Sequence, residues 1–146
     1  LELGLGVGYT ARNFEAYADI RRGLGGHEGI VGELGADVIA RPSDRWKLSF
    51  GPRLLWGNDA YADTYFGISP AEASVSLPAY DPDAGLMSAG VELGARYQIN
   101  DSWGVESAVT WENFTNDAED SPIVQNGDSD QWRFRIGVTR VFNLRF

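Results

Sequence analysis

The residues that could support hydrolytic chemistry are a single histidine, His27, and the neighbouring Glu28 in the segment GLGGHEG, together with serines such as Ser49 and Ser107. Hydrolases need an activated nucleophile beside a base, or a carboxylate paired with a histidine. A histidine flanked by glycines is more typical of a turn, so we expect no catalytic residue and no enzymatic activity. The chain has no cysteine, which excludes disulfides and thiolate-bound metals, and we expect no cofactor.

Charged side chains occur at alternate positions in several stretches of the chain, which is the spacing of one face of a β-strand. Mixed signs on neighbouring strands predict cross-strand ion pairs on this face. If the strands close into a barrel, the face lines either a selective channel or a lumen plugged by paired charges. The plug is favoured because many of the inward positions are glycines beside long arginines. The predicted lumen charges are Glu15, Asp19, Arg21, Glu33, Asp37, Lys47, Arg53, Glu92, Arg96, Glu106, Arg133 and Arg135.

Two segments, 58–85 and 114–130, each contain five acidic residues and no lysine or arginine, so the net charge of -9 arises in them. Such segments could bind divalent cations or attract a cationic partner, but plain solvation of surface loops is favoured. The start of a calcium loop is visible at Asp81 to Gly85, but the later ligand spacing is missing, so no metal site is assigned. Nucleic acid is excluded as a partner because there is no basic stripe. The acidic positions singled out are Asp59, Asp63, Asp81, Asp83, Asp117, Glu119 and Asp120.

Seven stretches with a period of two predict seven strands: 1–9, 14–22, 30–40, 46–57, 87–99, 103–113 and 132–146. Tight turns at 10–13, 41–45 and 100–102 alternate with the longer connections 23–29, 58–85 and 114–130. Short turns at one end and long loops at the other are typical of outer-membrane barrels, in which the short turns are periplasmic. A soluble up-and-down barrel could show the same asymmetry.

Aromatic residues near the strand ends favour the membrane interpretation. A soluble core would concentrate its aromatic residues in the middle of the strands, whereas a lipid-facing band is flanked by two aromatic girdles. In the last strand every even position is apolar except Arg140, which we expect to extend toward the headgroups. The predicted interface aromatics are Tyr9, Phe14, Trp46, Trp56, Tyr97, Trp103, Trp111, Trp132 and Phe146.

The composition agrees with one domain, residues 1–146, that crosses a membrane by strands. Hydrophobic residues make up 43% of the chain, and no apolar run approaches the length of a membrane-spanning helix. We therefore predict an all-β, antiparallel, up-and-down transmembrane β-barrel of the outer-membrane type. Because the chain opens within an alternating strand and without a signal peptide, we expect it to be the C-terminal part of a longer exported precursor. Seven or eight strands would then be present, from a barrel of ten or twelve.

Several blocks occur in an order that resembles the MipA/OmpV family, the MltA-interacting proteins of Gram-negative outer membranes. These blocks are GPRLLWGNDAYADTYFGISPAEA from Gly51, LPAYDPDAGL from Leu77, DAEDSPIV from Asp117 and GLGGHEG from Gly23. The resemblance spans the whole chain and corresponds to the C-terminal part of the family. It implies an outer-membrane location and a non-enzymatic scaffold for murein-remodelling enzymes. It carries no catalytic motif.

The partners expected on this basis are outer-membrane lipid and lipopolysaccharide, a lytic transglycosylase, a penicillin-binding protein, and the barrel-assembly machinery through the C-terminal strand. Two alternatives to the scaffold stay open. One is a small-solute channel that uses the charged lumen, and the other is a surface adhesin or cation-binding barrel that uses the acidic outer loops. The short periplasmic turns offer a scaffold little docking surface, which keeps these alternatives in consideration.

Overall fold

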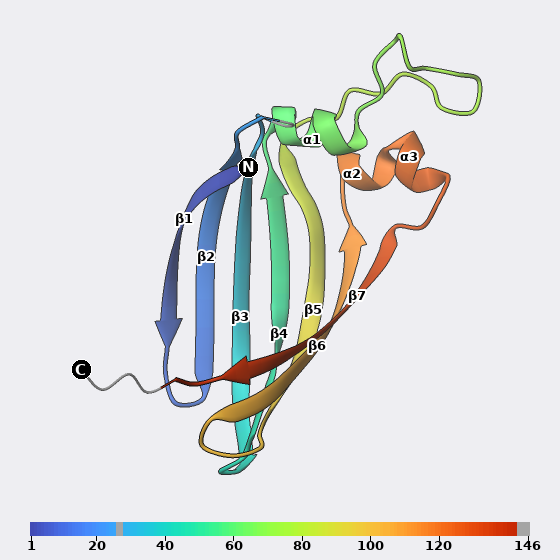
Figure 1. Cartoon of the computed structure of the whole chain (residues 1–146). Helices are drawn as coiled ribbons and strands as arrows, with labels where there is room; N and C mark the ends of the chain where they lie inside the picture. The colour runs from blue at the N-terminus through green and yellow to red at the C-terminus, as the bar shows by residue number, and fades with distance from the viewer. Residues whose placement is uncertain (26–27, 143–146) are drawn as a thin grey trace.

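The computed structural model describes residues 1–25 and 28–142, which form one antiparallel sheet of seven strands in the order of the chain (Figure 1). The predicted all-β class and up-and-down order are confirmed. No helix of the described residues is long and apolar enough to cross a membrane. His27 and Phe146 lie outside the described residues. The strands are β1 (Glu2–Thr10), β2 (Phe14–Gly23), β3 (Ile30–Ser43), β4 (Trp46–Gly57), β5 (Gly85–Gln98), β6 (Trp103–Phe114) and β7 (Asp130–Arg140).

The two faces of the sheet differ because apolar and polar residues alternate along each strand. Leu5 is 82% exposed and Ile136 is 80% exposed on one face, which we call the apolar face. On the opposite face, which we call the charged face, Asp37 and Arg53 are buried. The sheet therefore buries its charges and exposes its hydrocarbon, the reverse of a water-soluble sheet.

Short turns lie at one end of the sheet and long connections at the other (Figure 1). At the end that we call the turn end, two to four residues separate each pair of strands: 11–13, 44–45 and 99–102. β3 continues to Ser43, three residues beyond the expected end at Ala40, because Ser43 still pairs with Trp46 after a shift in register.

The two longest connections contain short helices, which were not predicted from the sequence. These helices are α1 (Asp59–Phe66), α2 (Asp117–Asp120) and α3 (Pro122–Gln125). The Asn58 side chain caps α1 by accepting a hydrogen bond from the backbone N–H of Tyr61 at 3.1 Å. Ser121 caps α3, where Pro122 occupies the first turn.

The helices pack together as a unit that we call the loop cap, residues 58–84 and 115–129. Its apolar cluster contains Ala62, Phe66, Ala118 and Val124 and rests on Met87 at the start of β5. The hydroxyl of Ser121, which is fully buried, donates a hydrogen bond of 2.6 Å to the carbonyl of Phe66 and so ties the two connections together. This cluster stabilises the loop end of the sheet by burying apolar surface.

Close approach of β3 and β4 requires a glycine at position 51. A Cβ atom there would overlap the carbonyl oxygen of Ala36 and approach the Cα of Asp37 to 2.9 Å. The paired positions of the two strands skip from Gly35–Arg53 to Val38–Phe50 at this point. Pro52, which has no N–H to donate, is accommodated in the same interruption.

We predict that Gly51→Ala lowers the free energy of unfolding by about 1–3 kcal/mol, because backbone of β3 must move to admit the methyl group. The matched control is Gly32→Ala on β3, where the nearest atom to a Cβ is the Asp19 carbonyl oxygen at an ordinary 3.6 Å. The control should change stability by less than about 1 kcal/mol. Urea unfolding followed by tryptophan fluorescence measures both, and equal midpoints for the two variants would contradict the prediction.

Candidate functional site: a charged cavity

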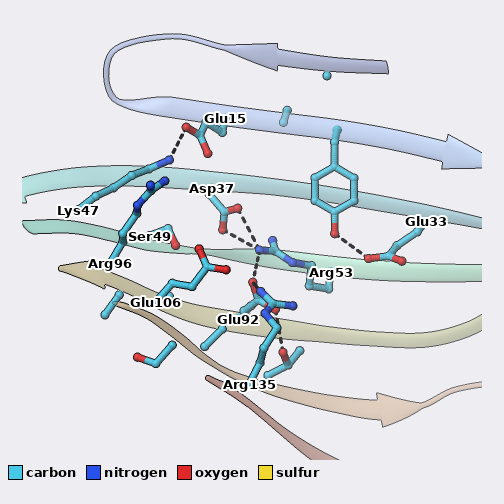
Figure 2. A pocket seen from close by; sticks show the side chains of 18 of the residues that line it. Glu15, Glu33, Asp37, Lys47, Ser49, Arg53, Glu92, Arg96, Glu106 and Arg135 are labelled. Carbon is cyan, nitrogen blue, oxygen red and sulfur yellow. Dashed lines mark hydrogen bonds and ion pairs between the residues drawn. The ribbon is translucent and has the colours of Figure 1, made fainter. Parts of the chain in front are cut away.

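All seven strands contribute residues to a cavity of about 520 Å³ on the charged face, so the sheet curves around this space (Figure 2). Most of the charged residues predicted from the sequence line it. Asp19 and Arg21 do not, and they line a smaller hollow of about 290 Å³ against β1. The predicted residues in the main cavity are Glu15, Glu33, Asp37, Lys47, Arg53, Glu92, Arg96, Glu106, Arg133 and Arg135.

Arg53 is the centre of an ion-pair network in the middle of the cavity (Figure 2). Its Nη2 donates to Asp37 Oδ2 and to Glu92 Oε1, each at 2.9 Å. The three side chains are only 8%, 11% and 13% exposed, in the order Arg53, Asp37, Glu92. Charges removed from water to this extent are tolerated only when they are paired and hydrogen-bonded. The network therefore holds β3, β4 and β5 together across the cavity wall.

Two further strands join this network through Glu92. The Thr110 hydroxyl of β6 donates to Glu92 Oε2 at 2.8 Å, and Arg135 Nη2 of β7 lies 3.5 Å from Glu92 Oε1. Thr110 was not among the predicted site residues because it carries no charge, although the alternation of β6 places it on this face. Five consecutive strands are thus linked through two carboxylates and two guanidinium groups.

A second cluster lies toward the loop end. The Tyr17 hydroxyl donates to Glu33 Oε1 at 2.6 Å, and Arg21 Nη2 donates to Glu33 Oε2 at 3.2 Å. Arg21 Nε also lies 3.3 Å from Asp19 Oδ1, but the angle is unsuitable for a hydrogen bond, so this contact is electrostatic. The Tyr17 ring packs over Gly35, where any side chain would collide with it. Tyr17 is a second neutral residue of the site that charge alone could not reveal.

The turn end of the cavity is only partly paired. Lys47 Nζ donates to Glu15 Oε1 at 2.5 Å. Arg96 is the register partner of both Lys47 on β4 and Glu106 on β6. Within residues 1–25 and 28–142, however, neither Arg96 nor Glu106 forms a hydrogen bond or an ion pair (Figure 2). This part of the cavity therefore offers one cation and one anion to a solute.

The aromatic residues predicted at the strand ends lie on the apolar face. Six of them are exposed: Tyr9, Phe14, Trp46, Trp56, Trp103 and Trp132. Tyr97 is less exposed because its ring packs on Trp46 at a centroid distance of 4.9 Å, and Trp111 is the register partner of Trp132. The Arg140 guanidinium lies 4.8 Å from the ring centre of Trp103 and 4.5 Å from that of Phe142. Cation–π contacts therefore hold this charge on an otherwise apolar face.

The acidic residues of the long connections support the loop cap. Asp59 accepts from the backbone N–H of Ala84 at 2.6 Å, and Asp117 accepts from that of Asp83 at 2.9 Å. The Tyr80 hydroxyl donates to the Asp117 carbonyl at 2.9 Å, and partial burial raises its pKa, as do the nearby carboxylates. Asp63, Asp81, Glu119 and Asp120 are exposed. In the described part of the chain, no three acidic or histidine residues are grouped so as to hold a metal ion.

The fold and the cavity define a class of antiparallel β protein with a charged, curved inner face and an apolar outer face. The family described as "MltA-interacting protein MipA" matches residues 1–142. The chain belongs to this family, and the resemblance stated from the sequence is confirmed. Comparison with curated proteins finds no match.

We predict that Arg53→Met lowers the free energy of unfolding by about 3–5 kcal/mol, because it leaves Asp37 and Glu92 as buried charges without their partner. Lys47→Met is the matched control, since its side chain and that of Glu15 are about a third exposed, and it should cost less than about 1 kcal/mol. Adding Asp37→Asn and Glu92→Gln to Arg53→Met should restore part of the loss. Urea unfolding provides the measurement, and equal effects of the Arg53 and Lys47 variants would disprove the role of the network.

Proposed function

We propose that this chain is an outer-membrane protein of a Gram-negative bacterium and acts as a non-enzymatic scaffold for murein-remodelling enzymes. The observation that carries the membrane part is the exposure of the apolar face. Leu5, Phe134 and Ile136 are 75–82% exposed on this face, and the aromatic residues lie toward its two ends. An apolar surface of this extent is expected to contact an apolar environment. An apolar band flanked by aromatic residues is typical of contact with outer-membrane lipid and lipopolysaccharide.

The scaffold part rests on the family, whose description names an interaction with MltA. The resemblance of the sequence to this family implies that the partner is a lytic transglycosylase of murein turnover, and a penicillin-binding protein is the second enzyme expected. Both would approach from the periplasm, where the turn end lies if the chain follows the outer-membrane pattern. Docking on the turn end is therefore the most direct way in which this chain could hold such an enzyme.

Among the described residues, the turn end carries a small excess of positive charge, with Arg12, Arg41 and Arg45 against Asp44 and Asp101. Arg12 and Arg45 are exposed in its turns, and the guanidinium of Arg41, near the end of β3, donates to the Arg12 carbonyl in the first turn. The opposite end carries the acidic loop cap. This difference in charge favours the approach of an acidic enzyme at the turn end over its approach at the loop cap.

We predict that brominated lipids quench the tryptophan fluorescence of the protein in vesicles, whereas iodide in the water quenches it weakly. All five tryptophans lie on the apolar face and none lines the cavity. A control variant, Arg135→Trp on the charged face, should add emission that brominated lipid does not quench. Strong iodide quenching of the unaltered protein, with no effect of brominated lipid, would contradict the membrane assignment.

We predict that Arg12→Glu combined with Arg45→Glu weakens binding of a purified lytic transglycosylase by about tenfold at low salt, because charges at the rim govern encounter. The difference should shrink at about 0.5 M salt, which screens such charges. The control carries Asp81→Asn and Asp120→Asn in the loop cap and should bind normally. Biolayer interferometry with the protein in detergent measures these affinities. No binding by the unaltered protein would exclude the scaffold.

A small-solute channel along the charged cavity is a second candidate, and it requires an open path through the inner face. The buried ion pairs of Arg53 and the loop cap at one end both favour a closed path over an open one. Single-channel conductance in planar bilayers distinguishes the channel from the scaffold, because a protein with a closed path passes no ionic current.

A further inference from the structure

We propose that the turn end of the charged cavity binds a small zwitterion, an amino acid or a short peptide. In this arrangement Arg96 would hold the carboxylate of the solute and Glu106 its ammonium group. The site is independent of any docked enzyme, and occupancy does not require an open channel. It therefore goes beyond the scaffold proposal.

The first argument is the pairing of the other charges that line the cavity. Each of them contacts a partner of opposite sign or a hydroxyl: Arg53, Glu92 and Arg135 in the central network, Glu33 with Tyr17 and Arg21, Lys47 with Glu15, and Arg133 with Glu112. Among the described residues, Arg96 and Glu106 are the two lining charges without such a contact. They have opposite signs, and their hydrogen-bonding capacity is left for a ligand.

The second argument concerns local electroneutrality. Lys47 and Arg96 are direct register partners on the same face, an arrangement of like charges that destabilises a sheet unless anions compensate. Glu15 compensates Lys47 through an ion pair, and Glu106, the register partner of Arg96, balances the charge of Arg96 without contacting it. The four side chains Lys47, Arg96, Glu15 and Glu106 sum to zero charge, so a ligand with no net charge preserves the balance. A simple anion or a simple cation would not.

The third argument is space. The cavity volume of about 520 Å³ lies within the usual range for small-molecule sites, roughly 300–1,000 Å³. Glycines stand beside both free charges: Gly94 precedes Arg96 on its own face, and Gly137 is the register partner of Glu106. A Cβ at Gly137 would already touch the Glu106 side chain at 3.3 Å. Glycine at these two positions leaves space around the two charges, and a larger side chain would occupy that space.

Titration calorimetry of the whole protein in detergent micelles provides the test, with the dipeptide L-alanyl-L-alanine as the probe. Two analogues carry one charge each: N-acetyl-L-alanine keeps the carboxylate, and L-alanine amide keeps the ammonium. We expect the dipeptide to bind at least ten times more tightly than either analogue. Absence of saturable dipeptide binding up to about 10 mM, or equal binding of the three compounds, would overturn the proposal.

Variants assign the two roles. Arg96→Gln should lose about tenfold in dipeptide affinity and leave the weak binding of L-alanine amide unchanged, and Glu106→Gln should do the same with N-acetyl-L-alanine in place of the amide. Arg45→Gln in the adjacent turn is the matched control and should bind the dipeptide normally. The exchange Arg96→Glu with Glu106→Arg keeps both charges present and should retain dipeptide binding. Loss of binding in the control, or unchanged binding in both single variants, would count against the site.

Discussion

The ion pairs of Arg53 with Asp37 and Glu92 are the interaction on which the rest of the sheet depends. The described strands bury few apolar side chains, among them Val31 and Ile39, because most of their hydrocarbon lies on the other face and the buried apolar cluster lies under the loop cap. Backbone ladders fix neighbouring strands but not the curvature of the sheet. The carboxylates of β3 and β5 hold these strands to the guanidinium groups of β4 and β7 and so define the cavity wall. Its polar character follows from the need to satisfy every charge removed from water.

The two proposals place different demands on the same fold. A scaffold uses the turn end as a surface and needs the sheet only as a rigid support, a demand that the central network meets. A solute site uses the inside of the same end and needs two charges left without partners. Both are compatible, since Arg12 and Arg45 lie in the turns whereas Arg96 and Glu106 lie within strands. Family membership bears on the first of these and says nothing of the second.

Much of the fold could be predicted because alternation along a strand is a local property that each stretch displays by itself. The helices α1, α2 and α3 could not be predicted in this way. They are short, since α1 ends before Gly67 and α3 begins only at Pro122, and they are stabilised because Phe66 and Val124 are buried in one cluster formed by two distant connections. Asn58 and Ser121 are of the residue types that cap helices, but they indicate a helix only together with that tertiary contact.

The residues on the charged face could be predicted, because alternate positions of a strand share a face. The ion pairs that these residues form could not. Gly35, and not Asp37, is the register partner of Arg53, and the ion pair forms because the long guanidinium reaches two residues along β3. The stagger of neighbouring strands and the lengths of side chains decide such contacts, and neither is visible in one strand. The same limitation applies to Arg96 and Glu106, whose lack of partners emerges only when all the other charges have been placed.

The location of the tryptophans has a spectroscopic consequence. Because none of the five lines the cavity, the intrinsic emission of the protein reports on the surroundings of the outer face and is insensitive to events inside. Tyr17 is the aromatic residue at the centre of the inner face, with the Arg53 guanidinium 5.6 Å from its ring. Tryptophan emission therefore reports on the exterior of this molecule, and a change confined to the surroundings of Tyr17 leaves every tryptophan in place.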